Sequence, residues 1–207
     1  MFPGFPAPEI TSFISREESR SFYSPGTEFL IQRITVIGNS GTYLDAPYHR
    51  YANGTELAAL DLSRLCDIPG VVVDVRSSVQ SGNLEIGSES VPEDVSGCAV
   101  LFQTGWDAHW SAPEYLAANP FLTGEAADLL VRRGAVIAGI DSWNVDDVAD
   151  KARPVHSILL RAGIPVVENM CRLDRLQGRA FRFHAPVLPL RHGAAIPVRA
   201  YAVVEPG

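Results

Sequence analysis

The sequence is poor in lysine and has no long apolar run. Lys151 is its single lysine, and together with the arginines it gives 17 basic residues against 24 acidic ones, a net charge of −7. A nucleic-acid-binding face needs clustered positive charge, so this balance argues against nucleic acid as a partner. No apolar run reaches the roughly 18 residues that cross a bilayer, so we expect no membrane span.

The cysteines are few and scattered. Cys66, Cys98 and Cys171 lie far apart in the chain and have no C-x-x-C spacing. Disulfide-stapled secreted domains usually have an even number of cysteines at regular spacings, so this pattern favours reduced, buried thiols. The N-terminal residues also lack the charged segment and apolar stretch of a signal peptide. We therefore expect a cytoplasmic protein.

Two common groups of catalytic motif are missing. No G-x-S-x-G is present, and Ser40 does not follow a strand and open a helix, so a serine hydrolase is not indicated. Neither G-x-x-x-x-G-K-[ST] nor G-x-G-x-x-G occurs, so the sequence gives no signal for a phosphate-binding loop. Any chemistry must come from other residues.

The apolar pattern predicts an α/β fold in one domain, residues 1–207, because 207 residues suffice for one sizeable core. Thr123 as N-cap and Gly134 as terminator delimit one helix, and a second is expected over 156–162. Strands alternating with helices favour an α/β domain with a mixed sheet. Short apolar runs predict buried strands at 70–75, 99–103, 135–140 and 165–167, and a further strand at 198–204.

The N-terminal segment has a different character. Pro3, Pro6 and Pro8 predict that residues 1–27 form an extended arm whose first ten residues lack regular structure. The β-branched run 29–37 then predicts a strand that leads into the next segment. Such an arm would suit contact with a neighbouring subunit.

The segment Gly38–Arg50 is the candidate active-site loop. It contains two glycines, an Asp-x-Pro and a histidine directly after a predicted strand. Asp45 lies there, and Asp141 and Glu168 follow other predicted strands, so these polar groups can meet at one sheet edge. Asp45, His156 and Glu168 form a set that binds a divalent metal. Each also has an ordinary structural explanation, as a turn former, a helix-start residue and a strand-end group.

The order of several motifs resembles the cyclase family, which includes bacterial kynurenine formamidase and isatin hydrolase. The family signature H-x-G-T-H-x-D-x-P-x-H corresponds to residues 39–49, which read N-S-G-T-Y-L-D-A-P-Y-H. The resemblance implies a swivelling β/β/α domain assembled as a homodimer or homotetramer. It also implies a metal-dependent attack of water on an amide or lactone carbonyl of a small molecule. Further matching segments are F-Q-T-G-W at 102–106, G-I-D-S at 139–142, P-V-H-S-I-L-L at 154–160, I-P-V-V-E-N at 164–169 and P-V-R-A at 197–200.

The same resemblance assigns roles to individual residues. Asp45, His156 and Glu168 match metal ligands of the family, and His49 matches its general acid or base. Asn39 and Tyr43 replace two ligand histidines, and a neutral amide or phenol is a weak ligand. We therefore expect one divalent metal, manganese or zinc, in place of two. An oxygen-rich set of ligands moves the preference away from zinc.

Two other functions remain compatible with these residues. Without a metal, Asp45, His49 and Tyr43 could serve a cyclase, dehydratase or isomerase, in which Tyr43 donates a hydrogen bond to a carbonyl or enolate oxygen. A non-catalytic relative is the third possibility. The predicted substrate-binding residues are Asn39, Trp106 and Phe102. The two aromatic side chains suit an apolar small molecule.

Overall fold

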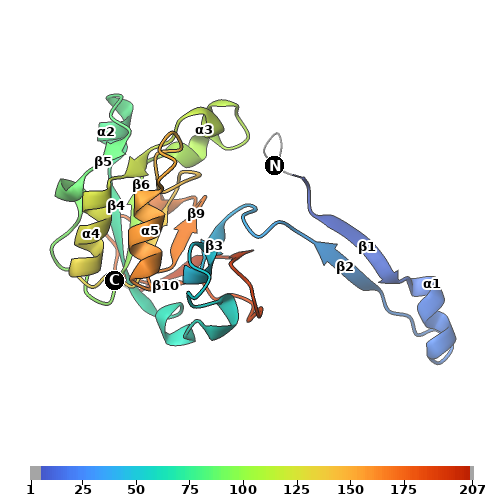
Figure 1. The fold of residues 1–207 in the computed structure, drawn as a ribbon. Helices are drawn as coiled ribbons and strands as arrows, with labels where there is room; N and C mark the ends of the chain where they lie inside the picture. The colour runs from blue at the N-terminus through green and yellow to red at the C-terminus, as the bar shows by residue number, and fades with distance from the viewer. Residues whose placement is uncertain (1–5, 206–207) are drawn as a thin grey trace.

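An eight-stranded mixed sheet forms the centre of the protein in the computed structural model, which describes residues 6–205 (Figure 1). Its four central strands, β4, β6, β8 and β9, run parallel to one another. The strands on either side are antiparallel to their neighbours. The order across the sheet is β11 (Ala195–Pro197), β3 (Tyr43–Asp45), β9 (Val166–Glu168), β8 (Ile137–Ile140), β6 (Ala99–Gln103), β4 (Ile68–Asp74), β10 (Phe181–His184) and β12 (Tyr201–Val204).

The central strands β6, β8 and β9 are buried on both faces, which explains their continuous apolar sequence. In β6, Val100 and Phe102 pack into the core on one face of the sheet. Ala99 and Leu101, which alternate with them, pack into the core on the other face. The predicted α/β fold with a mixed sheet is confirmed.

Helices α4 (Gly124–Arg132) and α5 (Pro154–Arg161) lie side by side over one face of the sheet (Figure 1). Thr123 caps α4 by accepting the N–H of Ala126, and Gly134, with φ of 75°, follows its end. Between residues 6 and 205, no helix combines the length and apolarity needed to cross a membrane. Shorter helices are α1 (Arg16–Ser19), α2 (Arg76–Gln80) and α3 (Glu114–Ala117), with 3₁₀ turns at Arg20–Phe22, Pro47–His49, Leu57–Ala59, Leu62–Arg64, Ser88–Ser90, Trp106–His109 and Leu173–Leu176.

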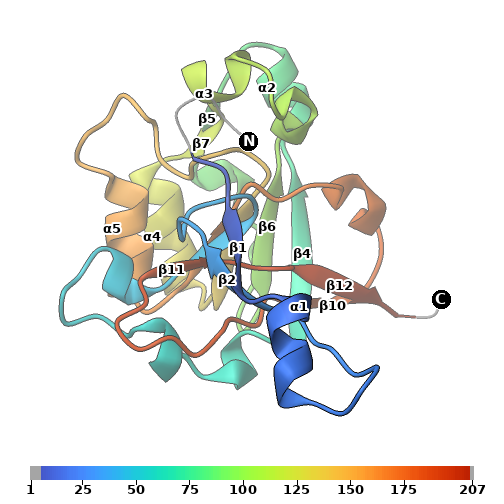
Figure 2. The same cartoon turned by 90° about the vertical axis from the view of Figure 1, so that its right-hand side faces the viewer.

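An N-terminal hairpin stands away from this body in Figure 1, and Figure 2 views the molecule from the side of the hairpin, which lies in front of the body. Its strands β1 (Glu9–Ile14) and β2 (Ile31–Thr35) pair in antiparallel fashion, and α1 belongs to the segment that connects them in the chain. The expectation that the first ten residues lack regular structure is wrong for Glu9 and Ile10, because pairing with β2 orders them. Pro3 and the rest of 1–5 lie outside the described residues. The predicted strand at 29–37 exists as β2, but it belongs to the hairpin and not to the large sheet.

Long-range pairing changes two further segments. The predicted loop 38–50 contains β3, which is inserted between β11 and β9. The strand β10 was not predicted, although Phe181 and Phe183 both lie on its buried face and alternate with less buried residues. A two-stranded parallel sheet, β5 (Glu85–Ile86) with β7 (Phe121–Leu122), completes the body.

Candidate metal centre

The register of two strands brings three polar side chains to one face of the sheet. In the antiparallel pair, Tyr43 lies opposite Glu168, and Asp45 lies opposite Val166. Directly opposed residues project to the same face, and so do residues two apart on one strand. Tyr43, Asp45 and Glu168 therefore share the face that α5 covers. All three are buried.

Helix α5 supplies the imidazole, and Asp146 fixes its orientation. The Asp146 carboxylate accepts the backbone N–H groups of Val155 at 2.6 Å and His156 at 3.1 Å, which have no partner inside the helix. Its Oδ2 atom also lies 2.6 Å from Nδ1 of His156. This contact leaves Nε2 facing the sheet, as outer-sphere carboxylates do for metal-binding histidines. The loop carrying Asp146 follows β8, and no sequence signal identified its role.

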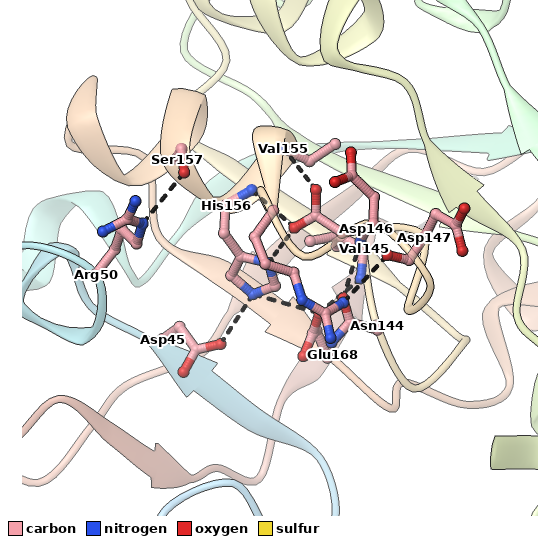
Figure 3. Close-up of polar contacts among 12 residues, drawn as sticks. Asp45, Arg50, Asn144, Val145, Asp146, Asp147, Val155, His156, Ser157 and Glu168 are labelled. Carbon is pink, nitrogen blue, oxygen red and sulfur yellow. Dashed lines mark hydrogen bonds and ion pairs between the residues drawn. The ribbon is translucent and has the colours of Figure 1, made fainter.

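The three predicted metal ligands converge. Nε2 of His156 lies 3.5 Å from Oδ2 of Asp45 and 3.6 Å from Oε1 of Glu168. One ligand atom from each residue lies within 4.8 Å of the other two. Figure 3 shows the imidazole between these carboxylates on one side and Asp146 on the other.

Two observations show that these residues fit a cation. Oδ2 of Asp45 is buried and has no hydrogen-bond partner among the described residues. Asp45, Asp146 and Glu168 are all completely buried around one imidazole, so negative charge exceeds positive charge. Buried carboxylates are costly without compensating charge, and a divalent cation supplies it. Two carboxylates and one imidazole are a donor set that manganese and zinc both accept.

Asn39 and Tyr43 contact two of these predicted ligands. The Tyr43 hydroxyl donates to Oε2 of Glu168. Burial first, and then the negative charge of Glu168, raises the pKa of Tyr43 well above its ordinary value, so it remains a neutral donor. Asn39 donates through Nδ2 to Oδ1 of Asp45 at 3.1 Å. Both side chains thus orient a carboxylate, and Asn39 directs its amide N–H towards Asp45.

The charges of the cluster are tightly coupled. Burial raises the pKa of Glu168, although the charge of His156 opposes this. Burial alone would lower the pKa of His156, but the charge of Glu168 and the contacts with Asp146 and Asp45 together outweigh burial and raise this pKa to about 10. The imidazole and the carboxylates therefore behave as one unit, and replacing any of them changes the others.

A cavity of about 360 Å³ opens above the cluster. His49 lines it from the 3₁₀ turn that follows β3; its side chain is 37% exposed and its Nδ1 lies 3.6 Å from Oδ1 of Asp45. The rim also contains Arg50, Lys151 and Arg153, which sequence reasoning did not associate with the site. Lys151 and Arg153 come from the loop before α5, far in sequence from Arg50.

Other predicted residues lie elsewhere. Phe102 is completely buried in the core, and Trp106 donates its indole N–H to the carbonyl of Tyr115. Neither lines the cavity, so their predicted role in substrate binding is not supported at this position. The carboxylate of Asp141 accepts hydrogen bonds from the backbone N–H groups of Thr104 and Gly105. Burial raises the pKa of Asp141 to about 6, against these hydrogen bonds.

Comparison with known proteins identifies several similar chains. A family model described as "Putative cyclase" matches residues 3–147. A kynurenine formamidase of Bacillus cytotoxicus is 31% identical over 170 residues, which are 82% of this chain and 78% of that protein. An isatin hydrolase bound to the product analogue thioisatinate has a TM-score of 0.80 at 23% identity, covering 98% of this chain and 83% of that one. A potential metal-dependent hydrolase with cyclase activity has a TM-score of 0.70 at 23% identity, covering 94% and 96%.

Proposed function

Because this chain belongs to the cyclase family, we propose that it is a metal-dependent hydrolase that cleaves the C–N bond of a small-molecule amide. The observation that carries the proposal is the buried cluster of Asp45, His156 and Glu168, with an unpartnered carboxylate oxygen beneath an open cavity. The name of one relative, kynurenine formamidase, points to a formamide as substrate. The name of a structural relative, isatin hydrolase, points to isatin as a second candidate.

Each residue has a defined task in this proposal. Asp45, His156 and Glu168 hold one divalent metal, manganese or zinc. When bound, such a metal polarises a carbonyl group and lowers the pKa of water towards neutrality. Asp146 holds the imidazole of His156, and Tyr43 and Asn39 orient the two carboxylates. These contacts keep the donor atoms in place before substrate arrives.

His49 moves the proton. It accepts a proton from the water molecule whose oxygen attacks the carbonyl carbon, and the C–N bond then breaks. His49 returns that proton to the leaving nitrogen, so the products are a carboxylic acid and an amine. Its exposed position on the cavity wall gives it access to both groups. The hydroxyl of Tyr43 is already donated to Glu168, which disfavours the metal-free use of Tyr43.

Removal of metal tests the proposal. We expect protein purified without chelator to contain about one manganese or zinc per chain and to hydrolyse members of a panel of formamides and cyclic amides. Chelation should abolish turnover, and added manganese or zinc should restore it. Metal content is measured by mass spectrometry, with mock-dialysed protein as the control. Full turnover in excess chelator would establish the metal-free alternative.

We also propose that residues 1–207 act as one domain that assembles into a homodimer or homotetramer through the hairpin. Ile10 and Ile34 face each other across β1 and β2 and are 58% and 65% exposed. Apolar side chains on an arm outside the body favour burial against a second copy. Ile10→Thr with Ile34→Thr should reduce the mass in light scattering towards the chain mass of 22.4 kDa. Leu62→Ser, exposed elsewhere, is the control; an unchanged mass in the double variant would exclude this interface.

A cytoplasmic location is part of the proposal. Cys66, Cys98 and Cys171 are unpaired in the structure, which is typical of a reducing compartment. Cell fractionation with antibody detection checks the location.

A further inference from the structure

The rim of the cavity has an unusual charge arrangement. Arg50, Lys151 and Arg153 line the same cavity as the metal cluster, in a chain whose net charge is −7. Among residues 6–205, none of the three forms an ion pair with a carboxylate. Their partners are neutral: Arg50 donates to the hydroxyl of Ser157, and Lys151 donates to a backbone carbonyl. The positive charge of the rim therefore remains available to a ligand.

The acidic side chains of the same loop do not line the cavity. Asp147 and Asp150 lie in that loop, and each accepts a backbone N–H, from Ala149 and Ala152. Asp146 is bound to His156 at the start of α5. With a divalent cation bound, the charges of Asp45 and Glu168 are offset as well. Positive charge then dominates the open part of the cavity.

Arg153 is the best placed of the three cations. Its Nη1 atom donates to Oδ1 of Asn144 at 3.1 Å and to the carbonyl oxygen of Asp147 at 3.3 Å. These bonds hold a half-buried guanidinium through Nη1, and its Nε and Nη2 donate no hydrogen bond to a described residue. The backbone of Arg153 is left-handed, with φ of 51°, a conformation that is costly for non-glycine residues and often found at functional sites. The free edge of a fixed guanidinium matches a carboxylate in a bidentate arrangement.

We propose that the substrate carries a carboxylate at the end remote from the scissile amide, and that Arg153 binds this carboxylate. This inference rests on the proposed amide hydrolysis. Arg50 and Lys151, both exposed at the rim, add a weaker and salt-sensitive attraction. Arg153 is thus a specificity-determining residue, and the substrate class is a carboxylate-bearing amide.

Matched substrates test the proposal. The three positional isomers of formamidobenzoate are compared with the corresponding formamidobenzamides, which are neutral and nearly the same size. We expect wild-type kcat/KM to favour the acid of at least one isomer by about 10-fold or more, as a charged hydrogen bond provides. Arg153→Gln should lower this acid-to-amide ratio by about 10–100-fold, and Arg153→Lys should restore part of it.

Two further measurements make the outcome decisive. Arg132→Gln, an exposed arginine on α4 outside the cavity, should leave the ratio unchanged. Calorimetric titration with the same acids and amides reports binding without turnover. One result would overturn the proposed function and retain the anion site. In it, no compound is hydrolysed, the formamidobenzoates bind more tightly than the formamidobenzamides, and Arg153→Gln removes this difference in affinity. Equal kcat/KM for the formamidobenzoates and the formamidobenzamides would overturn the anion site alone. An unchanged acid-to-amide ratio of kcat/KM in Arg153→Gln would do the same.

Discussion

Asp45→Asn is expected to abolish stoichiometric metal binding and to lower kcat/KM by about 10³-fold or more. Asparagine keeps the size of the side chain and its contact with Asn39, but replaces a charged oxygen with a neutral amide. Oδ2 of Asp45 is the buried oxygen without a partner, so the loss falls on the metal site and not on an internal hydrogen bond. The measurements are metal content by mass spectrometry and amide hydrolysis at saturating manganese.

Thermal unfolding gives this prediction a readout that does not depend on turnover. A metal present at about 100 times its dissociation constant stabilises the folded protein by about 2.7 kcal/mol. In a chain of 207 residues this raises Tm by about 5–10 °C. The manganese-induced increase should disappear in Asp45→Asn and persist in Asp61→Asn, which changes an exposed capping aspartate. A full increase in Asp45→Asn would show that Asp45 is not a ligand.

Local signals predicted part of the fold well. Helix α4 was placed correctly because its start and end depend on nearby residues: Thr123 caps it, and Gly134 adopts the left-handed conformation after it. The strand β6 was found because burial on both faces gives a short continuous apolar run. Such features are fixed by residues close together in sequence.

The strand β3 shows why other parts were missed. It has only three residues, and its Asp-Ala-Pro sequence favours a turn. Its conformation is decided by pairing with β9, more than 120 residues later, where Tyr43 meets Glu168. Tertiary pairing here overrides the local preference.

The sequence predicted the three residues of the buried cluster and not their surroundings. Asp45, His156 and Glu168 are residue types that commonly bind metals. The family resemblance also matched them to metal ligands of the family. Asp146 acts through Nδ1 of His156, a contact created by the fold of the loop before α5. Arg50 and Arg153 belong to distant segments, so their meeting at one cavity depends on how α5 packs beside the turn after β3. Charge alone does not distinguish them from the other arginines of the chain.

His49 is expected to separate catalysis from metal binding. His49→Gln should lower kcat by about 10²–10⁴-fold, the contribution of a positioned general acid or base, while metal content stays at the wild-type value. The reason lies in its position. Its side chain is 37% exposed, and it lies outside the buried ligand cluster. The variant should fold normally because glutamine at a partly exposed site leaves no buried cavity.

Chemical rescue identifies the lost function as proton transfer. In His49→Ala, added imidazole can occupy the space beside Asp45 and carry protons between water and the leaving nitrogen, so turnover should rise with imidazole concentration. Asp45→Asn should show no such rise, because it lacks a metal ligand and not a proton carrier. His192→Gln, at a side chain that is 87% exposed, should match the wild type throughout. Loss of metal from His49→Gln would instead make His49 a ligand, and the proton would then have to travel through another group on the cavity wall.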